Sequence, residues 1–302
     1  MPLKLFNPKS HTHVGLHIDS RRASAVAVDR KRVAAAASIE LPPGAVTDVG
    51  VAQPEQLSEA LRDLFGRADF GRRVYLGLSV RHGVVRLLDM PLVENEAERD
   101  AAVRFQAAEA IAMPLDEAIL DYAFVGQTVD PPAGPRMQVV LAAARRGPVG
   151  ELVEAVQGAG LKPLGIELEP FALVLALGEP AQENEAARLY VHLGGSNAIL
   201  AIAIGHTCMF TRSAPPNGPG LVEHIRMLLG YHASQPGARE VAEVVVSGAG
   251  ADGKVSLDAL GVPEGISVRF AAPLGKLEIG AGGEDDQRYL TLATGLALGA
   301  FA

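Results

Sequence analysis

The sequence contains little cysteine and few aromatic residues. One cysteine, Cys208, occurs among 302 residues, tryptophan is absent, and aromatic residues make up 5%. A single cysteine cannot form an intramolecular disulfide or a cysteine-rich metal site, which favours a reducing compartment. Cys208 falls within a predicted strand without the histidine and acid partners of a nucleophile. We therefore expect it to be a small, buried apolar residue.

Long hydrophobic runs and excess positive charge are also missing. The longest apolar runs, "FALVLALG" and "AILAIAIG", fall far short of the ~20 residues that cross a bilayer. The N-terminal "MPLKLFNPKSHTHVG" lacks the apolar core of a signal peptide. A formal net charge of −8 argues against a general affinity for nucleic acid. These features predict a cytoplasmic protein with no membrane span and no nucleic-acid partner.

The patterns that are present indicate an α/β protein. Two strands are predicted at 14–19 and 23–28, a third in "RVAAAASIELPPG", and an amphipathic helix in "PEQLSEALRDLFGRA". Further strands are predicted in "RVYLGLSV", "GVVRLLDMP", "AILDYAFVGQTV", "MQVVLAAARR" and "KPLGIELEP", with helices in "ENEAERDAAVRFQAAEAIAMP" and "GPVGELVEAVQGAGL". This block is rich in strand–helix–strand units.

A second cycle of the same kind follows. The strand–turn–strand pattern of "VGLHIDSRRASAVAV" (14–28) returns at 189–204 in "VHLGGSNAILAIAIG". The cycle continues with a strand in "HTCMFTR", a helix in "LVEHIRMLLGYHAS", a strand before "SGAGADG" and an apolar C-terminal helix. We interpret this as an internal duplication. Two facing hairpins of this kind clamp the phosphates of a nucleotide in actin-like ATPases, although any two adjacent hairpins give a similar pattern.

Three longer stretches resemble the type IV pilus assembly protein PilM family. They are "LLDMPLVENEAERDAAVRFQAAEAIAMPLDEAILDYAFV" (87–125), "VVLAAARRGPVGELVEAVQGAGLKPLGIELEPFAL" (139–173) and "VVVSGAGADGKVSLDALG" (244–261). The resemblance implies an actin-like fold of two ribonuclease-H-like lobes with an inserted subdomain, 1C. The implied divisions are 1–73 (subdomain 1A), 74–165 (1C), 166–188 (return to 1A) and 189–302 (second lobe, with the lid subdomain 2B largely missing).

The resemblance also implies a structural role. A PilM-like protein is a cytoplasmic scaffold, peripheral to the inner membrane, that binds the short cytoplasmic N-terminal peptide of a PilN-like membrane protein. The peptide is expected in a groove between subdomains 1A and 1C, where an extended segment can dock. Other platform or motor proteins, and a second copy of the chain, are further candidate partners. The apolar C-terminal helix has no basic flank, so we expect it to pack inside the protein rather than on a membrane.

The two phosphate loops depart from the pattern of that family. Histidine replaces the expected acid in both loops, and Asp19 stands where the first turn needs glycine. Imidazole is a poor substitute for the carboxylate and water oxygens that Mg²⁺ prefers. The predicted vestigial nucleotide-site positions are His17, Asp19, Ser20, His192, Gly194, Gly195, Ser196, Ser247, Gly248 and Gly250. We predict that ATP hydrolysis is lost and that no cofactor is required, with at most weak binding of Mg-ATP.

Several alternatives stay open at this level. His17 and His192, with His13, could form a transition-metal site, or could simply be hydrogen-bonded or solvated. Ser247–Gly250 could receive a ribose or phosphate, or could be a turn whose glycines permit close packing. An active actin-like ATPase that polymerises or cycles with nucleotide is the competing function, provided that acids elsewhere supply the metal ligands. A cytoplasmic domain akin to the secretion protein GspL is a third hypothesis.

Overall fold

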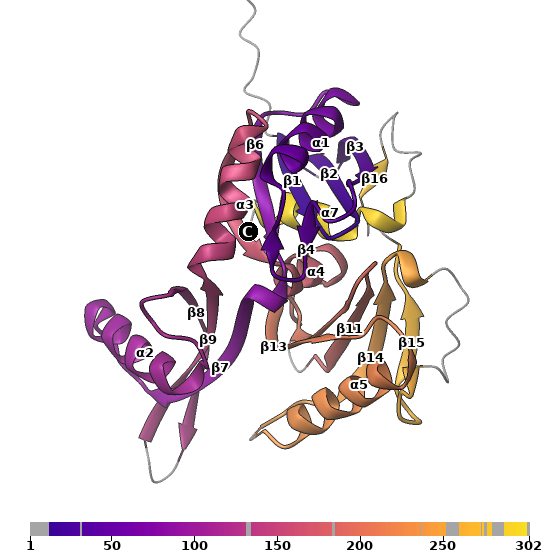
Figure 1. Ribbon diagram of the computed structural model, residues 1–302. Coiled ribbons are helices and arrows are strands. Elements are labelled where there is room, and N and C mark those ends of the chain that lie inside the picture. Colours follow the sequence, from indigo (N-terminus) through magenta and orange to yellow (C-terminus); the bar gives the residue numbers. More distant parts are fainter. Residues whose placement is uncertain are drawn as a thin grey trace, which may run out of the picture.

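The computed structural model describes residues 12–30, 32–130, 134–182, 185–235, 237–251, 260–272, 274, 277–279 and 287–300. The leader with His11, and residues 252–259 of the third stretch that resembles the PilM family, lie outside the described residues. Figure 1 shows a first sheet with its helices, a separate small sheet, and a second large sheet, with α4 and α7 between the two large sheets.

The first lobe is built on a six-stranded sheet. Its strands in spatial order are β10 (Lys162–Leu168), β6 (Arg73–Leu78), β1 (Thr12–Ile18), β2 (Arg22–Asp29), β3 (Arg32–Glu40) and β16 (Glu278–Ile279). β1 is antiparallel to β2 and parallel to β6, as a hairpin followed by a crossover requires. A two-stranded ribbon of β4 (Val46–Thr47) and β5 (Gly50–Val51) follows β3.

Two helices cover one face of this sheet. In α1 (Pro54–Gly66) the predicted apolar stripe of Leu57, Leu61, Leu64 and Phe65 is buried. α1 packs against α3 (Arg146–Gly158), and the Ser58 hydroxyl donates a hydrogen bond of 2.8 Å to the backbone oxygen of Ala155. The sequence predicted both helices and the buried stripe of α1, but it assigned α3 to the inserted subdomain rather than to this layer.

A three-stranded antiparallel sheet forms a separate unit. Its strands are β7 (Gly83–Pro91), β9 (Gly134–Arg145) and β8 (Ala118–Asp130), and helix α2 (Glu96–Ala110) packs on one face. A short 3₁₀ helix, Val80–His82, leads into it. β6 and β10 belong to the first sheet, so the separate unit spans 83–145, which is narrower than the expected 74–165.

The second lobe repeats the strand arrangement of the first. Its strands in spatial order are β13 (Thr207–Ala214), β12 (Ala198–Ile204), β11 (Ala187–Leu193), β14 (Val241–Ser247) and β15 (Ser267–Phe270). This matches β3, β2, β1, β6 and β10 in order and direction, which confirms the internal duplication. Helix α5 (Gly218–Ala233) follows β13 and takes the place that α1 has in the first lobe. Among the described residues between β13 and β14, it is the single helix.

Two central helices join the lobes. α4 (Glu169–Leu177) packs against strands of both sheets, and α7 (Thr291–Gly299) packs against α4, β1 and β2. Glycine permits these close approaches: a Cβ on Gly295 would lie 1.7 Å from the backbone oxygen of Ala172. A Cβ on Gly15 would likewise lie 2.0 Å from the oxygen of Ala293. α7 is buried, as predicted, whereas α4 was not predicted from the sequence.

No described helix is both long and apolar enough to cross a bilayer. Cys208 lies buried in β13, as predicted, and burial raises the pKa of its thiol. It packs in a core cluster that includes residues of α4. The apolar run "FALVLALG" lies in α4 and therefore packs inside the protein as a central helix.

Candidate functional site

The two hairpin turns predicted to hold phosphate face one cavity. β1 and β11 occupy equivalent places in their sheets, and both end at this cavity. Its volume is about 790 Å³. The predicted positions that line it are Asp19, Ser20, Gly194, Gly195 and Gly250, together with Tyr289 from the segment before α7. The structure thus brings half of the predicted site residues together between the lobes.

Asp19 turns back onto its own hairpin. Its Oδ1 accepts hydrogen bonds from the backbone N–H of Arg21 (2.7 Å) and of Arg22 (2.8 Å). Successive backbone N–H groups in a turn are what anion-binding loops use to hold phosphate. Here a carboxylate of the chain itself occupies them. The glycine expected at this position could not supply that internal anion.

Arg22 closes the same side of the cavity. Its guanidinium donates to Glu40 at 2.9 Å and lies 4.0 Å from the centre of the Tyr289 ring. A cation over an aromatic ring is a stabilising arrangement. The guanidinium of Arg22, next to the first turn, is therefore already paired with side chains of the protein itself.

His17 lies beneath the first turn and pairs with Glu169, the first residue of α4. The His17 Nε2 atom is 2.9 Å from Glu169 Oε1, and both side chains are buried. Position 17 shares the sheet face of Gly15, which is the face that α7 covers, because side chains alternate along a strand. The other oxygen of Glu169 accepts the backbone N–H of Val80 at 3.3 Å.

The pKa values of the pair shift toward the charged form of each partner. Burial alone would lower the pKa of His17, but the hydrogen bond and negative charge of Glu169 raise the pKa above its usual value. Burial alone would raise the pKa of Glu169, but His17 and the Val80 N–H bring it below its usual value. Each partner therefore favours the charged form of the other.

His192 has the equivalent position in the second lobe, but its pKa shifts in the opposite direction. Its Nδ1 lies 3.0 Å from the hydroxyl of Ser247, at the end of β14. Burial lowers the pKa of His192 to about 4, and the nearby charge of His17 adds to the effect. The duplication thus places both histidines toward the centre of the molecule, where the pKa of His17 is raised and the pKa of His192 is lowered.

The Ser247–Gly250 turn is tightly packed. Gly248 has a φ of +95°, and a Cβ on it would lie 2.4 Å from the backbone oxygen of Leu193. A Cβ on Gly250 would lie 2.9 Å from the side chain of Leu193. The turn approaches β11 this closely because both positions are glycine.

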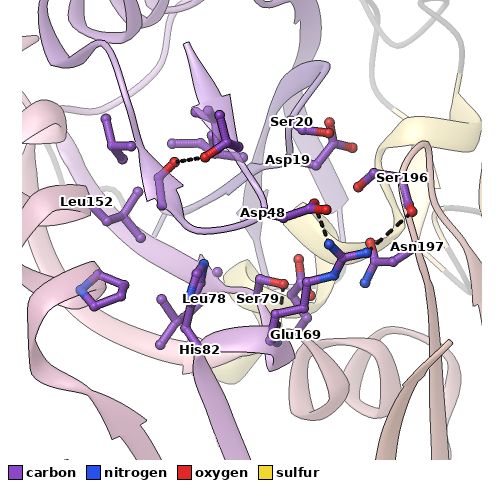
Figure 2. A pocket seen from close by; sticks show the side chains of 18 residues that line it. Asp19, Ser20, Asp48, Leu78, Ser79, His82, Leu152, Glu169, Ser196 and Asn197 are labelled. Atoms are coloured by element: carbon purple, nitrogen blue, oxygen red, sulfur yellow. Dashed lines mark hydrogen bonds and ion pairs between the residues drawn. The ribbon is translucent and has the colours of Figure 1, made fainter. Parts of the chain in front are cut away.

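A second, smaller cavity of about 60 Å³ adjoins the first turn, and Asp19 and Ser20 line it as well (Figure 2). Arg81 also lines it: the guanidinium pairs with Asp48 of the first lobe and donates to the backbone oxygen of Ser196 at 3.5 Å. Asp48 comes from the turn between β4 and β5, and Ser196 from the second hairpin turn. Arg81 therefore bridges the two lobes at the predicted site.

The described residues of the cleft do not form a set of Mg²⁺ ligands. Both oxygens of Glu169, the buried carboxylate beside the turns, accept hydrogen bonds from His17 and Val80, and Asp19 Oδ1 accepts from its own turn. In the described ranges, no group of three His, Cys, Asp or Glu side chains is placed to hold a metal ion. His13 instead packs near the Tyr75 ring, with ring centres 5.8 Å apart.

Sequence reasoning missed Glu169 and Arg81. A signal for Glu169 was available: an acid followed by Pro170, an apolar run and Gly178 is typical of a helix start and stop. The lobe-bridging contacts of Arg81 depend on the tertiary arrangement and left no such signal.

Comparisons with known proteins agree with this architecture. The sequence model of the family described as "Type IV pilus assembly protein PilM" matches residues 15–230. No curated protein matches the chain. A chain of a structure titled "PilM-PilN type IV pilus biogenesis complex" is 22% identical, with a TM-score of 0.78 over 96% of this chain and 98% of that one. The cytoplasmic domain of EpsL, an inner-membrane component of the type II secretion system of Vibrio cholerae, is 11% identical, with a TM-score of 0.52 over 95% of each chain.

The structural likenesses establish an actin-like fold, and the family match covers most of the sequence. The matched region contains both hairpin turns, the separate three-stranded sheet, the central helix α4 and most of α5. This chain therefore belongs to the type IV pilus assembly protein PilM family.

Proposed function

We propose that this protein is a cytoplasmic scaffold of a type IV pilus assembly platform, or of a related competence or secretion machine. It binds the cytoplasmic N-terminal peptide of a PilN-like membrane protein and is held at the inner membrane through that partner. The observation that carries the proposal is the family match over residues 15–230. Other platform or motor proteins, and a second copy of the chain, are further candidate partners.

The junction between the first lobe and the three-stranded sheet supports peptide binding. Val85 and Val140 from the three-stranded sheet join the apolar core of the first lobe. Ile119 lies on the same sheet face, because it pairs in register with Ala144, yet it stays 39% exposed. β10 is an outer strand of the first sheet and exposes Leu164. An apolar surface beside an open strand edge suits an extended peptide.

Calorimetric titration with the cytoplasmic N-terminal peptide of a PilN-like protein from the same organism tests the proposal. We expect binding by the unaltered protein and at least a tenfold weaker affinity for Ile119→Glu. Val49→Glu is the matched control, since Val49 is 82% exposed in the β4–β5 turn, and it should bind normally. Absence of binding, or equal binding by Ile119→Glu, would refute the assigned groove.

We further propose that ATP hydrolysis has been lost. Phosphoryl transfer depends on positioning and on the charge of bound metal ions. Three features support the loss: Asp19 occupies the N–H groups of the first turn, His17 occupies Glu169, and His192 is bonded to Ser247. The role of the cleft is then structural, holding the two lobes together.

Phosphate release and calorimetry with Mg-ATP test this second proposal. We expect no turnover and no micromolar binding. Because contaminating ATPases are common, any turnover must co-purify with the folded protein. Turnover that co-purifies with the unaltered protein would establish the competing function, an active actin-like ATPase.

A further inference from the structure

A separate pocket lies between the three-stranded sheet and the second lobe. β7 runs beside β13 at this place, and α5 closes the pocket on the third side. Figure 1 shows β7, β13 and α5 around this junction. The pocket has a volume of about 270 Å³, and neither hairpin turn of the nucleotide cleft contributes to its lining.

The floor of the pocket is apolar and its rim is partly exposed. Phe210 and Leu228 are buried, and Leu87 packs against the cores of both lobes. Tyr231 meets Phe210 edge to face, with ring centres 5.3 Å apart. Met227 and Tyr231 remain 47% and 53% exposed. Tyrosine, methionine and arginine are enriched where proteins bind one another.

Two arginines line this pocket, and no acidic residue does. Arg86 donates to the backbone oxygens of Ala110 (3.3 Å) and Val85 (3.0 Å). Among the described residues, Arg212 has a buried Nε without a hydrogen-bond partner, and its Nη2 contacts the sulfur of Met227 at 3.9 Å. Within the described part of the chain, neither guanidinium forms an ion pair with a carboxylate. The unsatisfied Nε of Arg212 favours an external acceptor, and the exposed Arg86 adds a second positive charge at the rim.

The shape of the pocket narrows the class of ligand. Sites for small-molecule ligands usually have a volume of roughly 300–1,000 Å³, so this pocket suits individual side chains better than a nucleotide. A guanidinium binds a carboxylate through two parallel hydrogen bonds, and the aromatic and Met side chains beside it suit an apolar neighbour. A short peptide with alternating acidic and apolar side chains satisfies both requirements.

We propose that the Arg86–Arg212 pocket binds an acidic segment of a partner protein, with one carboxylate on the arginines and an adjacent apolar side chain over Phe210. This site is at a different junction from the one assigned to the PilN-like peptide, and it does not depend on that assignment. The partner bridges the three-stranded sheet and the second lobe, because the two arginines come from β7 and β13.

Calorimetry with a synthetic peptide that alternates Glu with Phe and Leu tests the site. The same peptide with Gln for Glu is the ligand control. Arg212→Met removes the guanidinium while keeping an apolar stem, and we expect at least a tenfold loss of affinity. Arg226→Met is the matched control, because Arg226 is exposed on α5 but does not line the pocket, and the variant should bind as the unaltered protein does.

Further arms distinguish the outcomes. Arg212→Lys keeps the charge but cannot bind a carboxylate through two parallel hydrogen bonds. We expect its affinity to lie between those of the unaltered protein and Arg212→Met, with an unchanged circular dichroism spectrum. No binding by the unaltered protein, or equal binding of the Gln peptide or by Arg212→Met, would overturn the proposal. So would displacement of the peptide by inorganic phosphate, which would indicate a phosphate site. Self-association that Arg212→Met abolishes would make a second copy the occupant and refute the partner assigned here.

Discussion

Replacement of Glu169 should destabilise the protein strongly. Replacement by alanine removes the acceptor for two buried donors, His17 Nε2 at 2.9 Å and the Val80 N–H at 3.3 Å. It also leaves a buried imidazole without its counter-charge. Breaking one side of a buried ion pair costs about 3–5 kcal/mol, which is a large part of the stability of an ordinary domain. We expect Glu169→Ala to lower the free energy of unfolding by about this amount.

Urea unfolding followed by far-ultraviolet circular dichroism suits the measurement, because the protein has no tryptophan to report by fluorescence. Glu167→Ala is the matched control: it removes a carboxylate two positions away that bonds only the N–H of Leu168. Glu167 is exposed near the end of β10, so its removal should change stability by less than about 1 kcal/mol. Replacing both His17 and Glu169 by leucine should recover much of the loss. Equal effects of Glu169→Ala and Glu167→Ala would refute the importance assigned to this pair.

Three other predictions concern the same core. The pKa of His17 is raised, so the stability that its charged form contributes is complete below pH ~6.5 and is lost as the pH rises through the pKa of the folded protein. The pKa of His192 is lowered to about 4, so this residue reduces stability as the pH falls below ~6.5. His192→Phe should therefore gain about 3 kcal/mol relative to the unaltered protein between pH 7 and pH 4 in urea titrations at each pH, and an unchanged pH profile would contradict it. Gly295→Ala should lower the free energy of unfolding by about 1–3 kcal/mol or more, because its Cβ would lie 1.7 Å from a backbone oxygen of α4. Gly66→Ala is the control, because a Cβ there would meet nothing within 4 Å, and its free energy of unfolding should be nearly unchanged. Cys208, whose thiol pKa burial raises, should react with a thiol reagent only on unfolding, and rapid reaction in the native protein would show that it is accessible.

Much of the architecture follows from patterns in the sequence. The stripe of α1 and the repeated strand–turn–strand units depend on local periodicity, and the structure contains both. Strand alternation also carries over to the site: His17 and His192 are the second-last residues of equivalent strands, so the duplication places both toward the central helices. These inferences need only the order and spacing of residues.

Other features depend on contacts between distant segments and could not be predicted from the sequence. The sequence showed only that Asp19 replaces the glycine of the first turn, whereas the structure shows its carboxylate accepting hydrogen bonds from the amides of that turn. The His17–Glu169 pair joins residues 152 positions apart. The run of eight apolar residues in α4 is compatible with either a strand or a helix, so periodicity alone does not predict this helix.

The packing of α7 on β1 and β2 has a consequence for synthesis of the protein on the ribosome. Val26 and Val28 of β2 are buried in a cluster with Leu290, Ala293 and Ala297. At roughly 5–20 residues per second, the ribosome adds the last helix about 13–50 s after β2 has been made. Throughout that interval the nascent first sheet exposes an apolar face, which makes it a natural client for chaperones that shield unfinished chains.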